Sequence, residues 1–399
     1  MKADAAVTPG SRAGVAGRPS LGGVLRDWGR IGCLGFGGPP THIALLRELC
    51  VVRRGWMDAQ DFEDAVAACN LLPGPASTQL AIYCAWRLRG RVGALAGGLA
   101  FIVPGLVAIL ALSVLFLTGD PPLWVEGAGA GAGAAVAAVA VHAGWGLVPG
   151  SWARARRTGE ARWVVYLSLG LVAAASVGPW LVLLLLGCGV VEVIARRRGA
   201  DVASLALSPV LRVAAIVVGS GGLLSLAWVA FKVGALSYGG GFVIIPLMQG
   251  DAVDHYHWMT NSQFLNAVAL GQITPGPVVH TVAVVGYAAA GIGGGLWAAA
   301  IAFSPSFAFI LLGGDRFDRL RRNRRVRAFL DGAGPAAIGA IFGSAIPLTT
   351  ALAETWQYAV LAGAAIFLLV ARRGPVTTLL LAAAVGVVVA LAGGPVPHS

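Results

Sequence analysis

The stretch Leu72-Pro73-Gly74-Pro75 recurs 202 positions later in the chain as Thr274-Pro275-Gly276-Pro277. The same spacing relates the glycine-rich residues 32–38 to residues 234–240, and no gap is needed across about 45 positions. An ungapped internal repeat of this length predicts that the chain is built from two copies of one structural unit.

The composition places both copies in a membrane. Of the 399 residues, 57% are hydrophobic and only 12% are charged, whereas a soluble domain carries about 25% charged residues. The 57 Gly and 21 Pro residues favour close-packed and broken helices. We therefore predict an all-α polytopic membrane protein with helices that are interrupted by Gly and Pro.

Apolar runs divide each half in the same order. Two runs in each half are long enough to cross about 30 Å of hydrocarbon, and two shorter runs close each half. The long runs are 92–117, 128–148, 294–312 and 332–350, and the short runs are 163–179, 180–195, 356–371 and 376–393. We predict a disordered tail (1–20), a first repeat (21–200) and a second repeat (201–399), each repeat with about five spanning helices.

Loop charges indicate that the two repeats have inverted topology. Residues 118–127 contain acidic residues and no Arg, whereas the corresponding residues 315–331 are rich in Arg. The next pair of loops shows the opposite difference, because residues 151–162 are rich in Arg and residues 348–356 have none. Positively charged loops stay on the cytoplasmic side, so the two copies are expected to lie upside-down to each other. The cationic N-terminus fits this orientation poorly, which leaves the first span the least defined.

The segments around the two Pro-Gly-Pro turns are too short to span a bilayer. Residues 58–72 and 76–88 flank the first turn, and residues 260–272 and 278–290 flank the second. We predict two re-entrant helical hairpins whose tips meet near the midplane. The helix after each turn should begin near Pro75 or Pro277, where its unpaired N–H groups attract anions.

Candidate substrate-binding residues follow from this geometry. Arg30 and Lys232 occupy matched positions, and a cation within an apolar run is a functional candidate or else reaches back to the interface. His42 and His280 are candidates for contact with substrate or protons, or else core residues. The full set is Arg30, Gly37, Gly38, His42, Pro73, Gly74, Pro75, Ser77, Gln79, Lys232, Gly239, Gly240, Pro275, Gly276, Pro277, His280 and Thr281.

Other classes of function are disfavoured. The net charge of +11 comes from Arg clusters between apolar runs, which is typical of cytoplasmic loops rather than of nucleic-acid binding. The five Cys residues include no CxxC pair, and His255 and His257 have no accompanying ligand set. An enzyme acting on phosphate would need clustered carboxylates on an apolar helix, which the sequence lacks. We expect no catalytic residue, metal or cofactor.

The paired motifs resemble those of the chromate ion transporter family in its fused two-domain form. The resemblance is carried by Phe36-Gly37-Gly38-Pro39, Leu72-Pro73-Gly74-Pro75, Tyr238-Gly239-Gly240-Gly241 and Thr274-Pro275-Gly276-Pro277, and it covers nearly the whole chain. It implies a multi-pass carrier of the bacterial inner membrane that exports chromate, confers chromate resistance and uses the proton motive force. The family's second glycine motif usually departs from Gly-Gly-Pro, and here it reads Gly-Gly-Gly.

Two alternatives remain open on the sequence alone. One is a carrier of sulfate or another oxyanion, since sulfate shares the charge and shape of chromate. The other is an anion channel with the same inverted pore. The expected partners are the oxyanion, membrane lipid and a possible second copy in a homodimer, without nucleic acid.

The inverted topology is tested by labelling single cysteines from either side of the membrane. We expect Arg54→Cys and Asp254→Cys, each in a variant without the five native cysteines, to react with impermeant maleimide from opposite sides. Labelling of both positions from the same side would show that the repeats are parallel.

Overall fold

The computed structural model describes residues 19–70, 72, 74–117, 121–156, 159–176, 181–196, 222–237, 244–313 and 323–397. Within these ranges every regular element is a helix. The helices are α1 (Leu21–Leu34), α2 (Pro39–Arg47), η1 (Glu48–Arg53), α3 (Ala59–Cys69), α4 (Ala76–Phe116), α5 (Leu123–Ala155), α6 (Glu160–Ser176), α7 (Leu181–Ala195), α9 (Leu223–Leu236), α10 (Ile244–Gln249), η4 (Gly250–His255), α11 (Asn261–Ile273), η5 (Val278–His280), α12 (Thr281–Gly313), α14 (Arg324–Thr350), α15 (Thr355–Leu369) and α16 (Pro375–Leu391).

Four helical segments are long and apolar enough to cross a membrane. They are α4, α5, α14 and the continuous segment Val278–Gly313 formed by η5 and α12. Helices α7, α9, α15 and α16 are shorter and also apolar. Three of the four long runs predicted from sequence lie within these segments, and the run 92–117 extends one residue beyond α4. The protein is therefore an all-α polytopic membrane protein, as predicted. The number of spans per repeat and the inverted topology stay predictions.

Two long helices reverse direction at a glycine. The backbone leaves helical geometry at Arg89 and Gly90 in α4, and at Ala290 and Gly291 in α12, with a φ of 62° at both glycines. Glycine is favoured there because side chains rarely adopt positive φ. After the second reversal, the backbone at Gly294 packs closely on Gly286, so the two arms run side by side. The predicted hairpin arms 76–88 and 278–290 thus end at these reversals.

A π-helix occurs at matched positions in the two halves. Residues Glu48–Arg53 form η1, and residues Gly250–His255, 202 positions later, form η4. Each continues a short helix, α2 or α10, and each precedes the helix that leads to a Pro-Gly-Pro turn. Single turns of π-helix are rare and often lie at functional sites, so these two turns direct attention to their surroundings.

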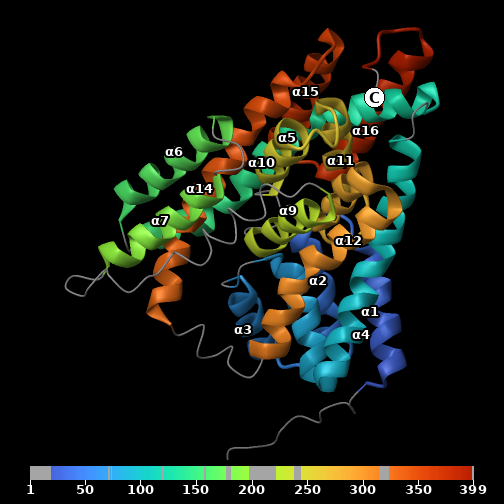
Figure 1. Ribbon diagram of the computed structural model, residues 1–399. Coiled ribbons are helices and arrows are strands. Elements are labelled where there is room, and N and C mark those ends of the chain that lie inside the picture. Colours follow the sequence, from blue (N-terminus) through green and yellow to red (C-terminus); the bar gives the residue numbers. More distant parts are fainter. Residues whose placement is uncertain are drawn as a thin grey trace, which may run out of the picture.

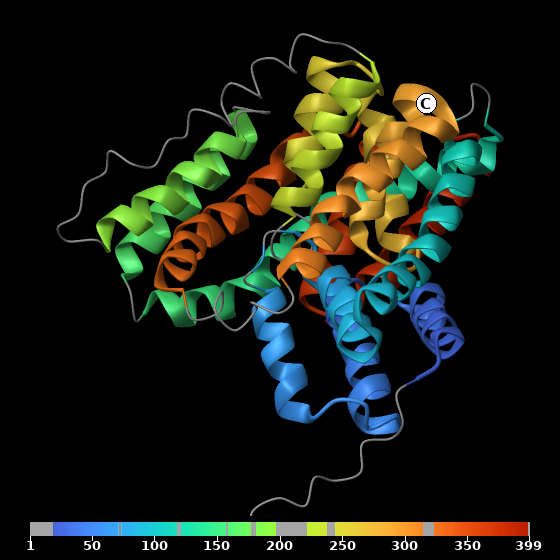
Figure 2. The ribbon, with the colours of Figure 1, turned by 60° about the horizontal axis from the view of Figure 1, so that its bottom comes forward.

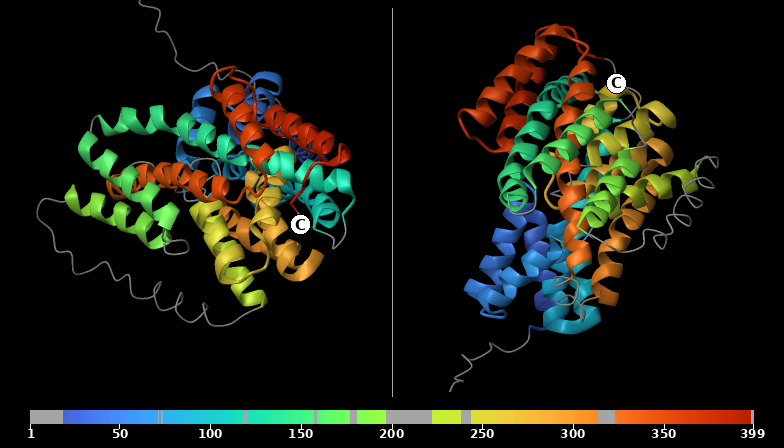
Figure 3. Two further views of the ribbon diagram at one scale, coloured as in Figure 1. Left: turned by 90° about the horizontal axis from the view of Figure 1, so that it is seen from above. Right: turned by 90° about the vertical axis from the view of Figure 1, so that its left-hand side faces the viewer.

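The helices pack in two groups, and each group draws on both halves of the sequence. The first group consists of α5, α6, α7, α14, α15 and α16, in which α14 lies against α5, α6 and α7 while α15 and α16 lie against α5 (Figure 1). In the second group α1 packs on α4, α9 on α12, and α4 on α12. Figure 2 shows α1, α2 and α3 at the bottom of the molecule, and Figure 3 shows α15 and α16 beside α5.

Glycines allow very close contacts between helices of the first group. A Cβ atom on Gly170 of α6 would overlap the backbone of Ala336 in α14, and one on Gly127 of α5 would overlap the backbone of Gly386 in α16. Close backbone approach at small residues is the usual way in which membrane helices associate, because lipid provides no hydrophobic drive. These contacts bring helices from opposite halves of the sequence together.

Replacement of Gly170 by Leu should separate α6 from α14 and lower the free energy of unfolding by about 1–3 kcal/mol. The measurement is the melting temperature of the purified protein in detergent. Gly187→Leu on α7 is the matched control, since a Cβ there would meet no atom within 4 Å. Equal melting temperatures for the two variants would contradict the role given to the close contact.

Candidate functional site

The segment after helix α1, in the first half, is hydrogen-bonded to the Pro-Gly-Pro turn of the second half. Helix α1 ends at Leu34, and the carbonyl of Gly35 accepts a hydrogen bond from the backbone N–H of Gly276 at 3.0 Å. The same carbonyl contacts the Nε2 atom of His42 at 2.9 Å. One backbone oxygen therefore joins a helix end, an imidazole and the second Pro-Gly-Pro turn.

His42 on α2 lies at the centre of this cluster and is fully buried. Because a carbonyl only accepts, Nε2 carries the hydrogen in the contact with Gly35. The other ring nitrogen, Nδ1, lies 3.3 Å from the Ser77 hydroxyl, which donates to it when the ring is neutral. The ring edge packs on Phe101 of α4 at 5.0 Å between centroids. Ser77 is the second residue of α4, so His42 reaches the start of the helix after the first turn.

His280 lies beside the second turn and is also fully buried. Neither ring nitrogen has a hydrogen-bond partner of good geometry among the described residues, although the Ile102 backbone lies near the ring. Glycines make room for the ring, since a Cβ on Gly105 would lie 2.8 Å from its Cε1 atom and one on Gly276 would lie 3.1 Å away. Because a buried polar group without a partner is costly, His280 is a candidate for contact with water or substrate.

The tip of the first hairpin packs against the second half. Gly74 has a φ of 117°, and a Cβ there would lie 3.1 Å from the carbonyl oxygen of Gly234 in α9 and 3.5 Å from the Ser306 hydroxyl in α12. The hydroxyls of Ser306 and Thr78 are buried without a hydrogen-bond partner among the described residues. Helix α4 begins at Ala76 with no side-chain cap, which leaves the first N–H groups without acceptors within the helix.

The remaining predicted residues have different surroundings. Pro75 and Pro277 directly precede α4 and η5 as N-cap residues, and the Pro275 carbonyl faces Gly105. The Thr281 hydroxyl donates to the Val278 carbonyl at 2.8 Å, so it is already satisfied within its own helix. Buried Gln79 lies beside Gly74, Gly37 lies beside Thr41, and Gly38 precedes α2 close to Val278. Pro73, Gly239 and Gly240 lie outside the described residues.

The two matched cations have different surroundings. Arg30 is exposed and lines an open pocket of about 410 Å³ that also contains Asp27, Glu48 and Arg53. Lys232 is buried, and its Nζ atom lies 2.5 Å from Asp251 Oδ2. Sequence reasoning singled out Lys232 but missed Asp251. The available signal was that Asp251 is the one charged residue in the apolar stretch 242–253.

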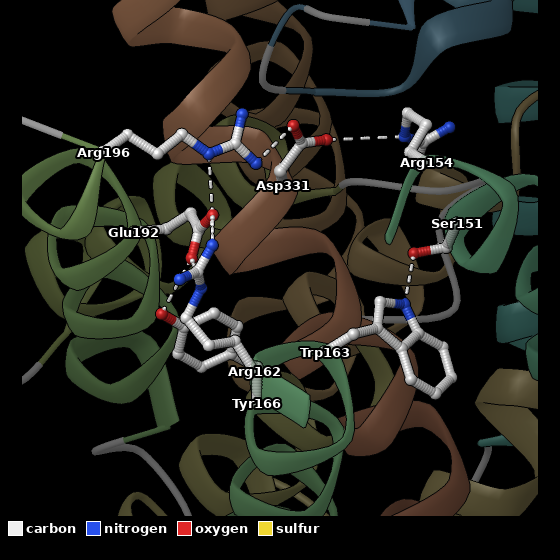
Figure 4. A network of polar contacts seen from close by, with 8 residues as sticks. All are labelled: Ser151, Arg154, Arg162, Trp163, Tyr166, Glu192, Arg196 and Asp331. Carbon is white, nitrogen blue, oxygen red and sulfur yellow. Dashed lines mark hydrogen bonds and ion pairs between the residues drawn. The ribbon is translucent and has the colours of Figure 1, made fainter. Parts of the chain in front are cut away.

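A second polar cluster joins the two halves within the first helix group (Figure 4). Glu192 of α7 is almost fully buried and pairs with Arg162 at 2.9 Å and with Arg196 at 2.7 Å. Arg196 also contacts Asp331 of α14 at 2.9 Å, and the Tyr166 hydroxyl donates to Glu192 at 3.1 Å. Because Arg196 bridges two carboxylates, it holds α7 against α14. This cluster lies on elements that carry none of the predicted site residues.

Removing one member of the Lys232–Asp251 pair should lower the stability of the protein more than removing both. Lys232→Met leaves the Asp251 carboxylate unpaired in an apolar setting, which costs about 3–5 kcal/mol of stability. The double variant Lys232→Met/Asp251→Asn carries no buried charge and should melt closer to the wild-type protein. Arg30→Met, at the exposed matched position, is the control and should be near neutral. Equal melting temperatures of the single and double variants would refute the expected coupling.

Comparison with known proteins identifies the family. The sequence profile of the family described as "Chromate transporter" matches residues 23–193 and 224–387. The chain is 32% identical over 334 residues to the "Chromate transport protein" of Cupriavidus metallidurans, with 80% of each chain covered. It is 29% identical over 345 residues to the "Chromate transport protein" of Pseudomonas aeruginosa, which covers 82% of this chain and 80% of that one.

A shorter relative matches one segment only. The "Uncharacterized transporter YwrB" of Bacillus subtilis is 41% identical over 83 residues, which are 21% of this chain and 42% of that protein, so it is about half as long. No solved structure matches the chain. The family profile spans both halves, and relatives that cover most of the chain are named as transport proteins rather than enzymes. The chain belongs to the chromate transporter family.

Proposed function

We propose that this protein is a secondary active transporter that exports chromate across a bacterial inner membrane and thereby confers chromate resistance. Membership in the chromate transporter family supports the substrate. Export, coupling to the proton motive force and acceptance of sulfate belong to the proposal. A homodimer likewise stays a prediction.

The observation that carries the proposal is the contact between Gly35, His42 and Gly276. Through it, the turn of the second hairpin lies against the glycine break of the first half, next to Ser77 at the start of α4. A tetrahedral dianion is well bound by free helix N–H groups together with hydroxyl and imidazole donors. We place the oxyanion at this junction, between the two hairpin tips.

The arrangement of matched elements supports alternating access. Each Pro-Gly-Pro turn contacts the opposite half. Gly276 of the second turn contacts Gly35, and Gly74 of the first turn lies beside Gly234. In carriers built from inverted repeats, such broken helices surround the substrate near the midplane of the membrane. The half-length relative is consistent with a unit of about 200 residues. We propose that the two repeats are inverted and that their relative movement exposes the oxyanion to either side.

A carrier is favoured over the alternative of an anion channel. His42, Ser77 and His280 are all buried, so the candidate site is closed to solvent in this conformation. A conducting channel needs a continuous aqueous path, whereas a carrier passes through closed states.

The decisive experiment is uptake of labelled chromate into inverted membrane vesicles, with and without a proton gradient and with sulfate as competitor. We expect saturable uptake that responds to the gradient, with vesicles lacking the protein as the control. Uptake that rises linearly with chromate concentration would favour a channel. Uptake equal to the control would refute chromate transport.

Filling the first hairpin tip should block this uptake. Gly74→Leu places a side chain against Gly234 and Ser306 at a positive φ, and we expect uptake to fall to background. The matched control is Gly293→Leu on α12, where a Cβ meets no atom within 4 Å. Ser306→Val, which adds bulk beside the tip without altering its backbone, should give an intermediate rate. Wild-type uptake by a well-expressed Gly74→Leu protein would exclude the tip from the pathway.

A further inference from the structure

The ion pair between Lys232 and Asp251 is the feature that the candidate site leaves unexplained. Lys232 is 7% exposed and Asp251 is 3% exposed, and no other Lys or Arg is buried among the described residues. The pair joins α9 to the π-helix η4 at 2.5 Å, and the ammonium lies 5.8 Å from the centre of the Trp228 ring. A charge pair within an apolar helix bundle is costly and points to a function.

The surroundings of the pair hold few other titratable groups. Helices α10, α11 and α12, which pack on α9 or η4, contribute no Asp, Glu, Lys, Arg or His. Tyr287 of α12 is partly exposed, and the remaining groups are Asp254 and His255 on η4 itself, both exposed. The charge state of Asp251 therefore depends on its burial, on Lys232 and on His255 of the same π-helix.

The first repeat shows that the fold does not require this pair. At the matched positions it has Arg30 on α1 and Leu49 on η1, so no carboxylate faces the cation from the equivalent place. The π-helix nevertheless forms there. An ion pair present in only one of two similar units is better explained by a task specific to that unit.

Helix α9 connects the pair to the first hairpin tip. Gly234 lies two residues after Lys232, and its carbonyl oxygen lies beside Gly74. On its other side Gly234 packs on the backbone of Ala302 in α12. Helix α9 therefore places the ion pair two residues from a contact with the first tip.

We propose that Asp251 binds and releases a proton during transport and thereby controls the position of α9. With the carboxylate charged, Lys232 is held on η4. When a proton from water binds Asp251, the acid becomes neutral, the ammonium keeps its charge, and the attraction between them is lost. Helix α9 is then free to shift at the tip of the first hairpin, and the positive charge of Lys232 becomes available to an approaching oxyanion. This inference rests on the proposed transport of an anion, in which Asp251 acts as a positioning residue.

The test measures chromate uptake into proteoliposomes as a function of pH. For the wild-type protein we expect the rate to fall by about tenfold for each pH unit on the alkaline side of the transition, as for one titrating group. Asp251→Asn mimics the protonated acid, so its profile should be flat. The double variant Lys232→Met/Asp251→Asn has no unpaired charge, so it should melt near the wild-type temperature. Because it also lacks the positive charge offered to the oxyanion, it should take up chromate slowly at every pH.

Glu192→Gln is the matched control, since Glu192 is another buried, ion-paired carboxylate on an element without predicted site residues. It should keep the wild-type pH profile even if its stability is lower. A pH-dependent profile in both Asp251 variants, or a flat profile in the wild-type protein, would overturn the inference while leaving chromate transport intact.

A second measurement reads the proton on Asp251 without any substrate. Infrared difference spectra of the wild-type protein and Asp251→Asn should contain a protonated carboxyl band that disappears as the pH is raised. If this band titrates while the vesicles take up no chromate, the proposed function fails and the proton switch stands. The absence of a titrating band would refute the switch whatever the substrate.

Discussion

The central constraint on this protein is that a broken helix in apolar surroundings must find partners for its exposed backbone groups. The carbonyl of Gly35, at the end of α1, receives both the Nε2–H of His42 and the N–H of Gly276. Without water to satisfy it, that oxygen would be costly to bury. Its two donors come from different halves of the sequence, so satisfying one carbonyl also fixes how the halves meet.

The two helix groups are held together by different means, which suits different tasks. In the first group, glycines bring backbones into contact and Arg196 bridges Glu192 and Asp331 across helices. The second group contains the interrupted helices, the two reversals and, among the described residues, the Thr78 and Ser306 hydroxyls that lack hydrogen-bond partners. A closely packed group beside a group of broken helices is a physical basis for one part staying fixed while the other moves.

The repeats are similar in backbone and different in chemistry. Both have a π-helix and a Pro-Gly-Pro turn at matched places, and each has a glycine reversal within one residue of the same spacing. His42 corresponds to Ile244, however, and His280 corresponds to Thr78, so each half carries one imidazole at a different point. The cation is exposed in one half and paired with a carboxylate in the other. A site formed between the two halves would therefore combine similar backbone geometry with different charges on its two sides.

The sequence by itself determined the fold class and the four long helices. These depend on local properties, namely apolar length and the backbone preferences of Gly and Pro, which can be read along the chain. The tertiary structure decided which residues meet. The pairing of Lys232 with Asp251 and the sharing of the Gly35 carbonyl depend on helix packing between distant segments. Matched sequence positions suggested that Arg30 and Lys232 were equivalent, but burial and partners come from neighbouring helices, and these differ between the two halves.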